Sequence, residues 1–174
     1  MRKLERATYI SEYLEKLYPK TPIPLTHQNN YELLIAVLLS AQCTDVNVNN
    51  VTKNIYPKYY QPKHFIKLGR KKIEKLIKKI GIFRIKAKSI YNLYKILIDK
   101  YDGKVPKTFE ELEKLPGVGH KTASVVMSQG FGFPAFAVDT HIHRLAQRWG
   151  LTNGKNVMQT EKDLKRLFPK KKLE

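Results

Sequence analysis

The sequence predicts an all-α protein, and three observations lead to this fold class. Apolar residues recur every three or four positions along most of the chain, which is the spacing of one face of a helix. Proline and glycine separate these stretches where helices are expected to end. No segment of useful length alternates between apolar and polar residues, and the one short strand candidate, residues 135–138, lies in a connection.

The N-terminal region predicts a helix, a linker and a buried helix. The first helix is marked by apolar residues at helical spacing, namely Leu4, Ala7, Ile10, Leu14 and Leu17. A linker follows, broken by three prolines at Pro19, Pro22 and Pro24. The next helix covers Tyr31 to Gln42, with Asn29 or Asn30 as its cap. Residues 33–39 are apolar on all sides, so we expect this helix to be central and buried.

Four further helices are expected before the central glycine motif. Thr44 or Asp45 can cap the first of them, which carries Val48, Val51 and Ile55 and ends before Pro57. Residues 73–80 form the second, with Gly81 as its C-terminal cap and lysines on its outer face. After the link Ile82 to Arg84, the third runs to Gly103. Thr108 begins the fourth, whose first turn holds Glu110 and Glu111, where negative charge suits the helix dipole.

The charge of the chain favours a polyanionic partner. Lys and Arg total 33 against 15 Asp and Glu, which gives a net charge of +18 over 174 residues. Such an excess is typical of nucleic-acid binding. The alternative is a well-solvated surface in a lysine-rich proteome, because 26 of the basic residues are lysine and the usage resembles that of an AT-rich genome.

Cysteine usage and the N-terminus predict an intracellular protein. Cys43 is the single cysteine, so it excludes an internal disulfide and any site built from several cysteine ligands. Glu5 and Glu12 interrupt the N-terminal segment, which is therefore not expected to be a signal peptide. No apolar run approaches membrane-spanning length. We expect a bacterial protein of the cytoplasm, associated with the nucleoid.

A glycine-rich turn between two helices is the most specific motif. It consists of Leu115, Pro116, Gly117, Val118, Gly119, His120, Lys121, Thr122 and Ala123. Its glycines permit a tight hairpin whose backbone amides can approach a phosphate closely. This pattern predicts a helix-hairpin-helix that binds the sugar-phosphate backbone of DNA without reading sequence. The alternative is an ordinary corner between two helices.

Two residues near this motif have the chemistry of a catalytic pair. Lys121 lies in the first turn of the second helix, where the positive end of the dipole favours a neutral amine that can form a Schiff base. Alternatively, Lys121 contacts phosphate. Asp139 precedes the segment Thr140 to Arg144 and is expected to cap that helix, and a carboxylate can also stabilise oxocarbenium-like charge or accept a proton. His141 and His143 are two residues apart, which makes a metal pair unfavourable on a helix, so no metal site is predicted.

Three stretches of the chain resemble the signature sequences of the endonuclease III family of helix-hairpin-helix DNA glycosylases. They are Tyr31 to Asp45, Leu115 to Ala123 and Ala137 to Ile142, in collinear order within a match from about Leu4 to Pro169. The resemblance implies a bifunctional glycosylase and abasic-site lyase that removes oxidised pyrimidines from damaged double-stranded DNA. It places Lys121 and Asp139 on the catalytic lysine and aspartate. Lysine at this position is typical of the bifunctional branch.

The resemblance also implies how the target base leaves the duplex. Glycosylases of this kind flip the damaged base out of the helix stack. Gln42 matches the residue that fills the vacated space, and Ile82 matches an apolar residue inserted beside the opposite strand. Without the resemblance, Gln42 is a polar helix end and Ile82 a core residue. Asp45 and His141 match positions at the base pocket, although Asp45 serves equally well as a helix cap.

One departure from the family concerns its iron–sulfur cluster. Family members usually carry four cysteines in a C-terminal loop that bind a [4Fe-4S] cluster, and this sequence ends before that loop would begin. We therefore expect no cofactor, and a natural short form, a degraded gene product and a truncation all fit this ending. The resemblance implies two lobes, the second incomplete: residues 23–132 with the hairpin at about 108–129, and residues 1–22 with 133–174. We expect a monomer. A non-catalytic DNA-binding remnant and a monofunctional glycosylase for another lesion remain the alternatives.

Overall fold

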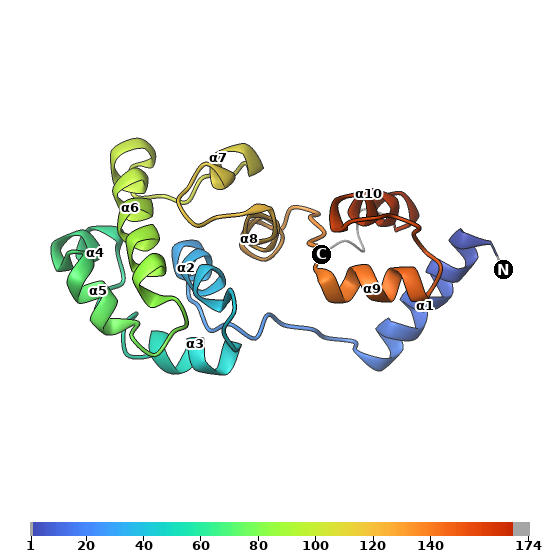
Figure 1. Ribbon diagram of the computed structural model, residues 1–174, viewed down its shortest axis with the longest axis horizontal. Coiled ribbons are helices and arrows are strands. Elements are labelled where there is room, and N and C mark those ends of the chain that lie inside the picture. Colours follow the sequence, from blue (N-terminus) through green and yellow to red (C-terminus); the bar gives the residue numbers. More distant parts are fainter. Residues whose placement is uncertain (1, 169–174) are drawn as a thin grey trace. The chain divides into compact units, whose positions relative to one another are not determined.

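The computed structural model describes residues 2–168, and every regular element in that range is a helix (Figure 1). No strand occurs between Arg2 and Phe168, so the predicted all-α class is confirmed for this part of the chain. Pro169 and the residues after it lie outside the described range. None of the described helices is long and apolar enough to cross a membrane.

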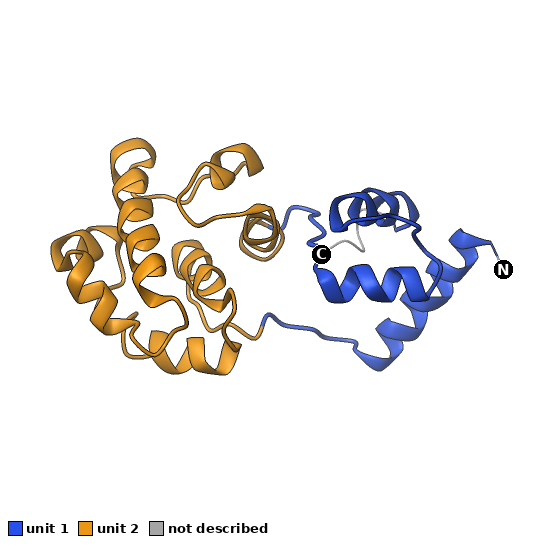
Figure 2. Ribbon diagram, in the orientation of Figure 1, with its two compact units in different colours: residues 1–23, 132–174 blue, residues 24–131 orange. Residues whose placement is uncertain are grey.

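The chain divides into two compact units (Figure 2). Unit 1 combines residues 1–23 with residues 132–174, and unit 2 comprises residues 24–131. Ile23 and Gly132, which the sequence places at the ends of the hairpin lobe, fall on the unit 1 side of these boundaries.

Unit 2 contains the helices of the predicted hairpin lobe. In chain order they are α2 (Asn30–Ser40), α3 (Asp45–Thr52), α4 (Pro62–Leu68), α5 (Arg70–Leu76), α6 (Phe83–Tyr101), α7 (Phe109–Glu113), α8 (His120–Val125) and the π-helical turn η1 (Val126–Gly130).

Helix α2 is the centre of unit 2, as its sequence predicts. Every residue from Glu32 to Leu39 is buried, and α2 packs against α3, α6, α8 and η1. Asn29 is the cap, because its side chain accepts a hydrogen bond from the backbone N–H of Glu32 at 3.0 Å. The buried Glu32 carboxylate in turn accepts the N–H of Gln28 at 2.7 Å. The backbone N–H and the buried carboxylate of Glu32 therefore both have hydrogen-bond partners at this end of the helix.

The structure selects one of the two predicted caps of α3, and several helix ends differ from the prediction. Helix α2 ends at Ser40 and not at Gln42. Helix α3 is capped by Thr44, whose hydroxyl accepts the N–H of Asn47, so Asp45 is the first helical residue and not the cap. The same helix ends at Thr52, and Ile55 reaches the core from the turn that follows. Helix α5 ends at Leu76 and not at Gly81, because Ile77 already leaves helical geometry and the N–H of Ile80 closes a turn onto its carbonyl.

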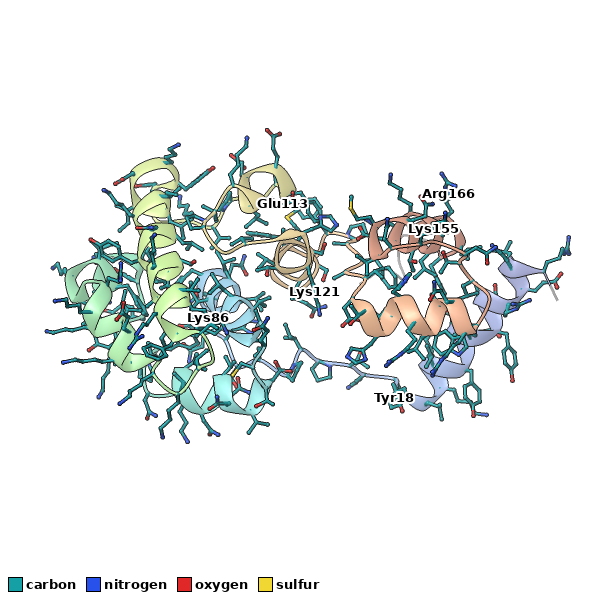
Figure 3. All side chains as sticks on the ribbon, in the orientation of Figure 1. Tyr18, Lys86, Glu113, Lys121, Lys155 and Arg166 are labelled. Carbon is teal, nitrogen blue, oxygen red and sulfur yellow. The ribbon has the colours of Figure 1, made fainter. Side chains whose placement is uncertain are left out.

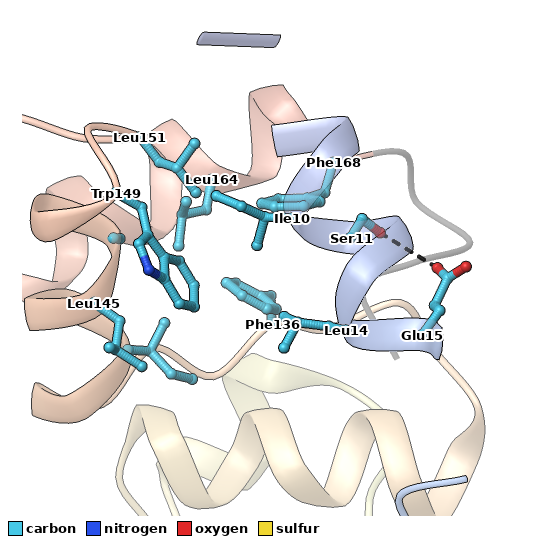
Figure 4. A pocket seen from close by; sticks show the side chains of 12 residues that line it. Ile10, Ser11, Leu14, Glu15, Phe136, Leu145, Trp149, Leu151, Leu164 and Phe168 are labelled. Carbon is cyan, nitrogen blue, oxygen red and sulfur yellow. Dashed lines mark hydrogen bonds between the residues drawn. The ribbon is translucent and has the colours of Figure 1, made fainter. Parts of the chain in front are cut away.

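Unit 1 is built from three helices among its described residues: α1 (Lys3–Leu17), α9 (Thr140–Arg148) and α10 (Val157–Leu167). Its buried cluster consists of Ala7, Val138, Ala146, Leu151 and Leu164. Beside this cluster lies an apolar pocket lined by residues of all three helices, including Ile10, Leu145 and Leu164, and by Phe136, Trp149 and Phe168 outside the helices (Figure 4). Ala7 is the only fully buried residue of α1, so this helix contributes few residues to the core of unit 1.

Candidate functional site

The predicted hairpin is formed by α7, α8 and the turn between them. Thr108 caps α7 by accepting the N–H of Glu111 at 3.3 Å, as the sequence predicts. In the turn, Leu115 and Val118 are buried, and the N–H of Val118 bonds to the carbonyl of Leu115 at 3.1 Å. These two side chains anchor the turn to the core of unit 2, while the glycines between and after them form its surface.

The two glycines of the turn have different surroundings. Gly117 has φ +81°, and a Cβ atom there would lie 2.9 Å from Cβ of Ser89 on α6 and 3.1 Å from a methyl carbon of Leu38 on α2. Only glycine satisfies both the left-handed backbone and this close approach. Gly119 has extended backbone, and no atom lies within 4 Å of the position a Cβ would take. Gly117 therefore fixes the hairpin on the fold, and Gly119 leaves an open surface at the start of α8.

Lys121 is the second residue of α8, and its side chain is exposed (Figure 3). Gly119 occupies the N-cap position and contributes no capping side chain, so the start of α8 is formed by backbone and is accessible from solvent. Helix α8 continues directly into η1, which extends the helical segment to Gly130. The structure thus places Lys121 in the first turn after the hairpin, as the sequence predicts.

His120 is held within the hairpin by two contacts. Its Nδ1 lies 2.7 Å from a carboxylate oxygen of Glu113, and its ring stacks on Phe109 at 5.8 Å between centroids. Both partners come from α7 or its end, so His120 connects the two helices of the motif. Pro116 and Thr122 are half-buried on either side of the turn.

Asp139 is the N-cap of α9, which confirms its predicted structural role. One carboxylate oxygen accepts the backbone N–H groups of His141 and Ile142 at 3.0 and 2.9 Å. These bonds fix the side chain at the start of the helix. His141 is exposed, whereas His143 lies 2.7 Å from the hydroxyl of Thr160 on α10. The two histidines point to different surroundings, as their spacing predicts, and residues 2–168 contain no cluster of three or more metal-binding side chains.

Lys121 belongs to unit 2 and Asp139 to unit 1. The structure brings together two other predicted residues, Gln42 and Ile82, which both lie in unit 2. Each has a left-handed backbone, with φ +56° and +50°. Gly81, next to Ile82, lies against the carbonyl oxygen of Gln42, which would be 3.4 Å from a Cβ at Gly81.

Gln42 and Ile82 are both exposed. Gln42 follows the end of α2, and the side chain of Ile82 is 51% exposed at the start of α6. The alternative role of Ile82 as a core residue is therefore wrong. Asp45, at the start of the neighbouring α3, is half-buried.

Sequence reasoning missed two side chains next to these turns. Lys86 is buried, and its ammonium donates to the carbonyls of Leu39 and Ala41 at 2.9 and 2.6 Å. Asn47 donates to the carbonyl of Lys79 at 3.0 Å and to the sulfur of Cys43 at 3.2 Å. Three of these four hydrogen bonds leave no local signal in the sequence, because their partners lie more than 30 residues apart along the chain.

The residues of this chain do not fit a [4Fe-4S] cluster. Such a cluster needs several thiolate ligands, and the sequence contains one cysteine. The sulfur of Cys43 is half-buried at the end of α2, where it accepts a hydrogen bond from Asn47.

Comparison with known proteins identifies the family. The model of the HhH-GPD superfamily base excision DNA repair proteins matches residues 35–170. Endonuclease III of Bacillus subtilis (strain 168) is 44% identical over 98% of this chain and 78% of its own length. Endonuclease III of Escherichia coli (strain K12) is 45% identical over 91% of this chain and 76% of its own.

Solved structures give the same result. A non-covalent endonuclease III–DNA complex matches with a TM-score of 0.94 and 45% identity over 99% of this chain and 81% of that one. A trapped endonuclease III–DNA covalent intermediate matches with the same TM-score and identity, over 99% of this chain and 82% of that one. Because both the sequence and the fold match over nearly all of the 174 residues, the chain belongs to the endonuclease III family of the HhH-GPD superfamily.

Proposed function

We propose that this protein is a base-excision repair enzyme that removes a damaged base from double-stranded DNA and then cleaves the strand at the abasic site. The observation that carries the proposal is Lys121, a lysine in the first turn after a DNA-binding type of hairpin, in a family with a solved covalent DNA intermediate. A covalent bond to DNA requires a nucleophile, and an amine can supply one.

In the first chemical step, an amine of the enzyme displaces the damaged base from the sugar. The neutral amine of Lys121 attacks C1′ of the damaged nucleotide, and the bond between C1′ and the base breaks, so the base leaves with the electron pair and takes up a proton. Asp139 stabilises the positive charge that develops on the sugar and accepts the proton that the amine loses. The capping bonds from His141 and Ile142 orient the Asp139 carboxylate before the substrate arrives.

The second step breaks the DNA strand. Opening of the sugar ring gives a Schiff base between Lys121 and C1′. This iminium acidifies the C2′ hydrogen; removal of that proton expels the 3′ phosphate by β-elimination. Water then hydrolyses the Schiff base and returns the free amine. No electrons are gained or lost, so the reaction needs no redox partner.

Several polar and apolar residues are proposed to hold the DNA. The backbone of residues 115–120 and Thr122 contacts phosphate at the hairpin, where the open surface at Gly119 supports close approach. Gln42 and Ile82 enter the space left by the flipped base, and their exposure supports this role. Asp45 and His141 contribute to the base pocket. Oxidised pyrimidines are the proposed lesions.

A strand-cleavage assay on a duplex with one abasic site tests the proposal. We expect cleavage on the 3′ side of the abasic site by the lyase step. Base release without cleavage would indicate a monofunctional glycosylase, and binding without either reaction would indicate a non-catalytic DNA-binding protein. Both outcomes would contradict the proposed lyase activity.

We also propose that this chain works without an iron–sulfur cluster. A single cysteine cannot supply the ligands, and none of the steps above needs iron. Iron and sulfide analysis of the purified chain should give substoichiometric amounts. Stoichiometric iron, with visible absorbance, would contradict this part of the proposal.

A further inference from the structure

Lys86 is the one buried lysine among residues 2–168, and the reaction proposed above does not use it. It lies on α6 where this helix packs against α2 (Figure 3). Only 4% of Lys86 is exposed. Burying an ammonium is costly unless it is well hydrogen-bonded, so its partners define what it does.

The ammonium of Lys86 binds the C-terminal end of α2. It donates to the carbonyls of Leu39 at 2.9 Å and of Ala41 at 2.6 Å. The last carbonyls of a helix have no partner within the helix, and the negative end of the dipole favours a cation there. Lys86 therefore caps α2 from a distance of more than 40 residues along the chain.

The carbonyl of Ala41 also controls the backbone of Gln42. It belongs to the peptide plane that ends at the nitrogen of Gln42, so holding this carbonyl restricts rotation about the N–Cα bond of Gln42. The φ angle of Gln42 is +56°, which is unfavourable for a residue with a Cβ atom. A strained backbone of this kind persists only where its surroundings determine it. Through its bond to Ala41, Lys86 supplies one of the hydrogen bonds that do so.

Lys86 contacts the second left-handed residue as well. Its backbone N–H bonds to the carbonyl of Ile82 at 3.2 Å, in the first turn of α6. Asn47 adds a second link between the two turns, because its amide donates both to the sulfur of Cys43 and to the carbonyl of Lys79. The turns that carry Gln42 and Ile82 are thus joined through Lys86 and Asn47 and lie against each other at Gly81.

We propose that Lys86 is a positioning residue that holds Gln42 and Ile82 as one preformed wedge for insertion into the DNA duplex. The inference rests on the proposed function, in which these two side chains fill the space of the flipped base. A preformed wedge loses little conformational entropy on binding, so more of the binding energy is left for unstacking the damaged base. Lys86 itself does not contact the reacting atoms.

Lys86→Met tests this role. The variant keeps the aliphatic stem and removes both side-chain hydrogen bonds. Burial lowers the pKa of Lys86, with a smaller opposing effect of Cys43, so Met also removes a desolvation cost and the fold is expected to survive. Tyr56→Phe is the matched control, because it too removes a buried hydrogen bond to an α2 carbonyl, that of Glu32, at the other end of the helix.

Single-turnover base release from a thymine-glycol duplex, with 2-aminopurine next to the lesion, gives the readout. Lys86→Met should slow base release on the order of tenfold to a hundredfold and reduce the 2-aminopurine signal of unstacking. Affinity for undamaged duplex should be nearly unchanged. Tyr56→Phe should change neither rate nor signal. In a Gln42→Ala background, Lys86→Met should add little, because it acts through the wedge.

The outcomes separate this inference from the proposed function. If the unchanged protein neither releases the base nor cleaves an abasic site, the proposed function fails. If it does both, but Lys86→Met behaves like Tyr56→Phe, or its effect is as large without Gln42 as with it, the positioning role is wrong. Should Lys86→Met not fold, Asn47→Ala removes the other link at a more exposed position, and an unchanged unstacking signal in that variant would overturn the inference.

Discussion

Asp139 has a structural and a proposed catalytic role, and the two can be separated by one substitution. Asn caps helices about as well as Asp, so Asp139→Asn should keep the bonds to His141 and Ile142 and leave the melting temperature nearly unchanged. The lost charge should slow base release by about a hundredfold or more. The measurement is single-turnover base release beside a thermal melt. A variant that releases base at the normal rate would exclude the proposed role of the carboxylate.

The two hairpin glycines should respond differently to alanine. Gly117→Ala places a Cβ in left-handed backbone against Ser89 and Leu38, which should destabilise unit 2 by about 1–2 kcal/mol from the backbone conformation alone. Gly119→Ala meets no atom and should fold normally. Its added methyl group covers the open surface at α8, so it should weaken binding to duplex DNA. Urea unfolding and DNA titration of both variants test this difference, and equal effects on stability would refute it.

At the residue scale, the sequence predicts the place of a residue in the fold where that place depends on its neighbours along the chain. Lys121 in the first turn of α8 and Asp139 as the cap of α9 follow from glycine and capping patterns that span a few residues. Lys86 could not be found in this way. It is one of 26 lysines, and its role depends on carbonyls that α2 brings to α6 only in the folded protein.

At the scale of single elements, the contribution of a helix cap to the free energy of unfolding can be tested. Asn29 accepts the N–H of Glu32 at the start of the buried helix α2, so Asn29→Ala should lower the free energy of unfolding by about 1 kcal/mol. Asn54→Ala is the control, because the side-chain bond that it removes, to the carbonyl of Asn50, is exposed. Urea denaturation measures both. Equal stability of the two variants would show that the cap contributes nothing.

Helices were predictable where their pattern was long, and less so at their ends. The buried α2 and the striped α6 follow from their apolar patterns. The ends of α3 and α5 differed, because buried residues such as Ile55, Ile77 and Ile80 continue a helical spacing through turns. Helix α4 was not predicted at all; its seven residues are too few to show a period.

At the scale of the whole molecule, the net charge predicts how binding depends on salt. With +18 charges and a hairpin that presents backbone to phosphate, most contacts to undamaged duplex should be electrostatic. The logarithm of the association constant should then fall linearly with the logarithm of salt concentration, with a slope of about −0.9 for each phosphate neutralised. Fluorescence anisotropy over a salt series measures this slope. Affinity that is independent of salt would contradict a binding mode based on phosphate contacts.

The central claim is that Lys121 forms a covalent bond to DNA, and borohydride trapping tests it most directly. Reduction during incubation with an abasic-site duplex should convert the Schiff base into a stable protein–DNA adduct, and peptide mapping should locate it at Lys121. Lys121→Gln should give no adduct while binding DNA nearly as well, with Lys114→Gln on the exposed surface of the same hairpin as the control that still forms it. An adduct that persists in Lys121→Gln, or that maps to another amine, would contradict this mechanism.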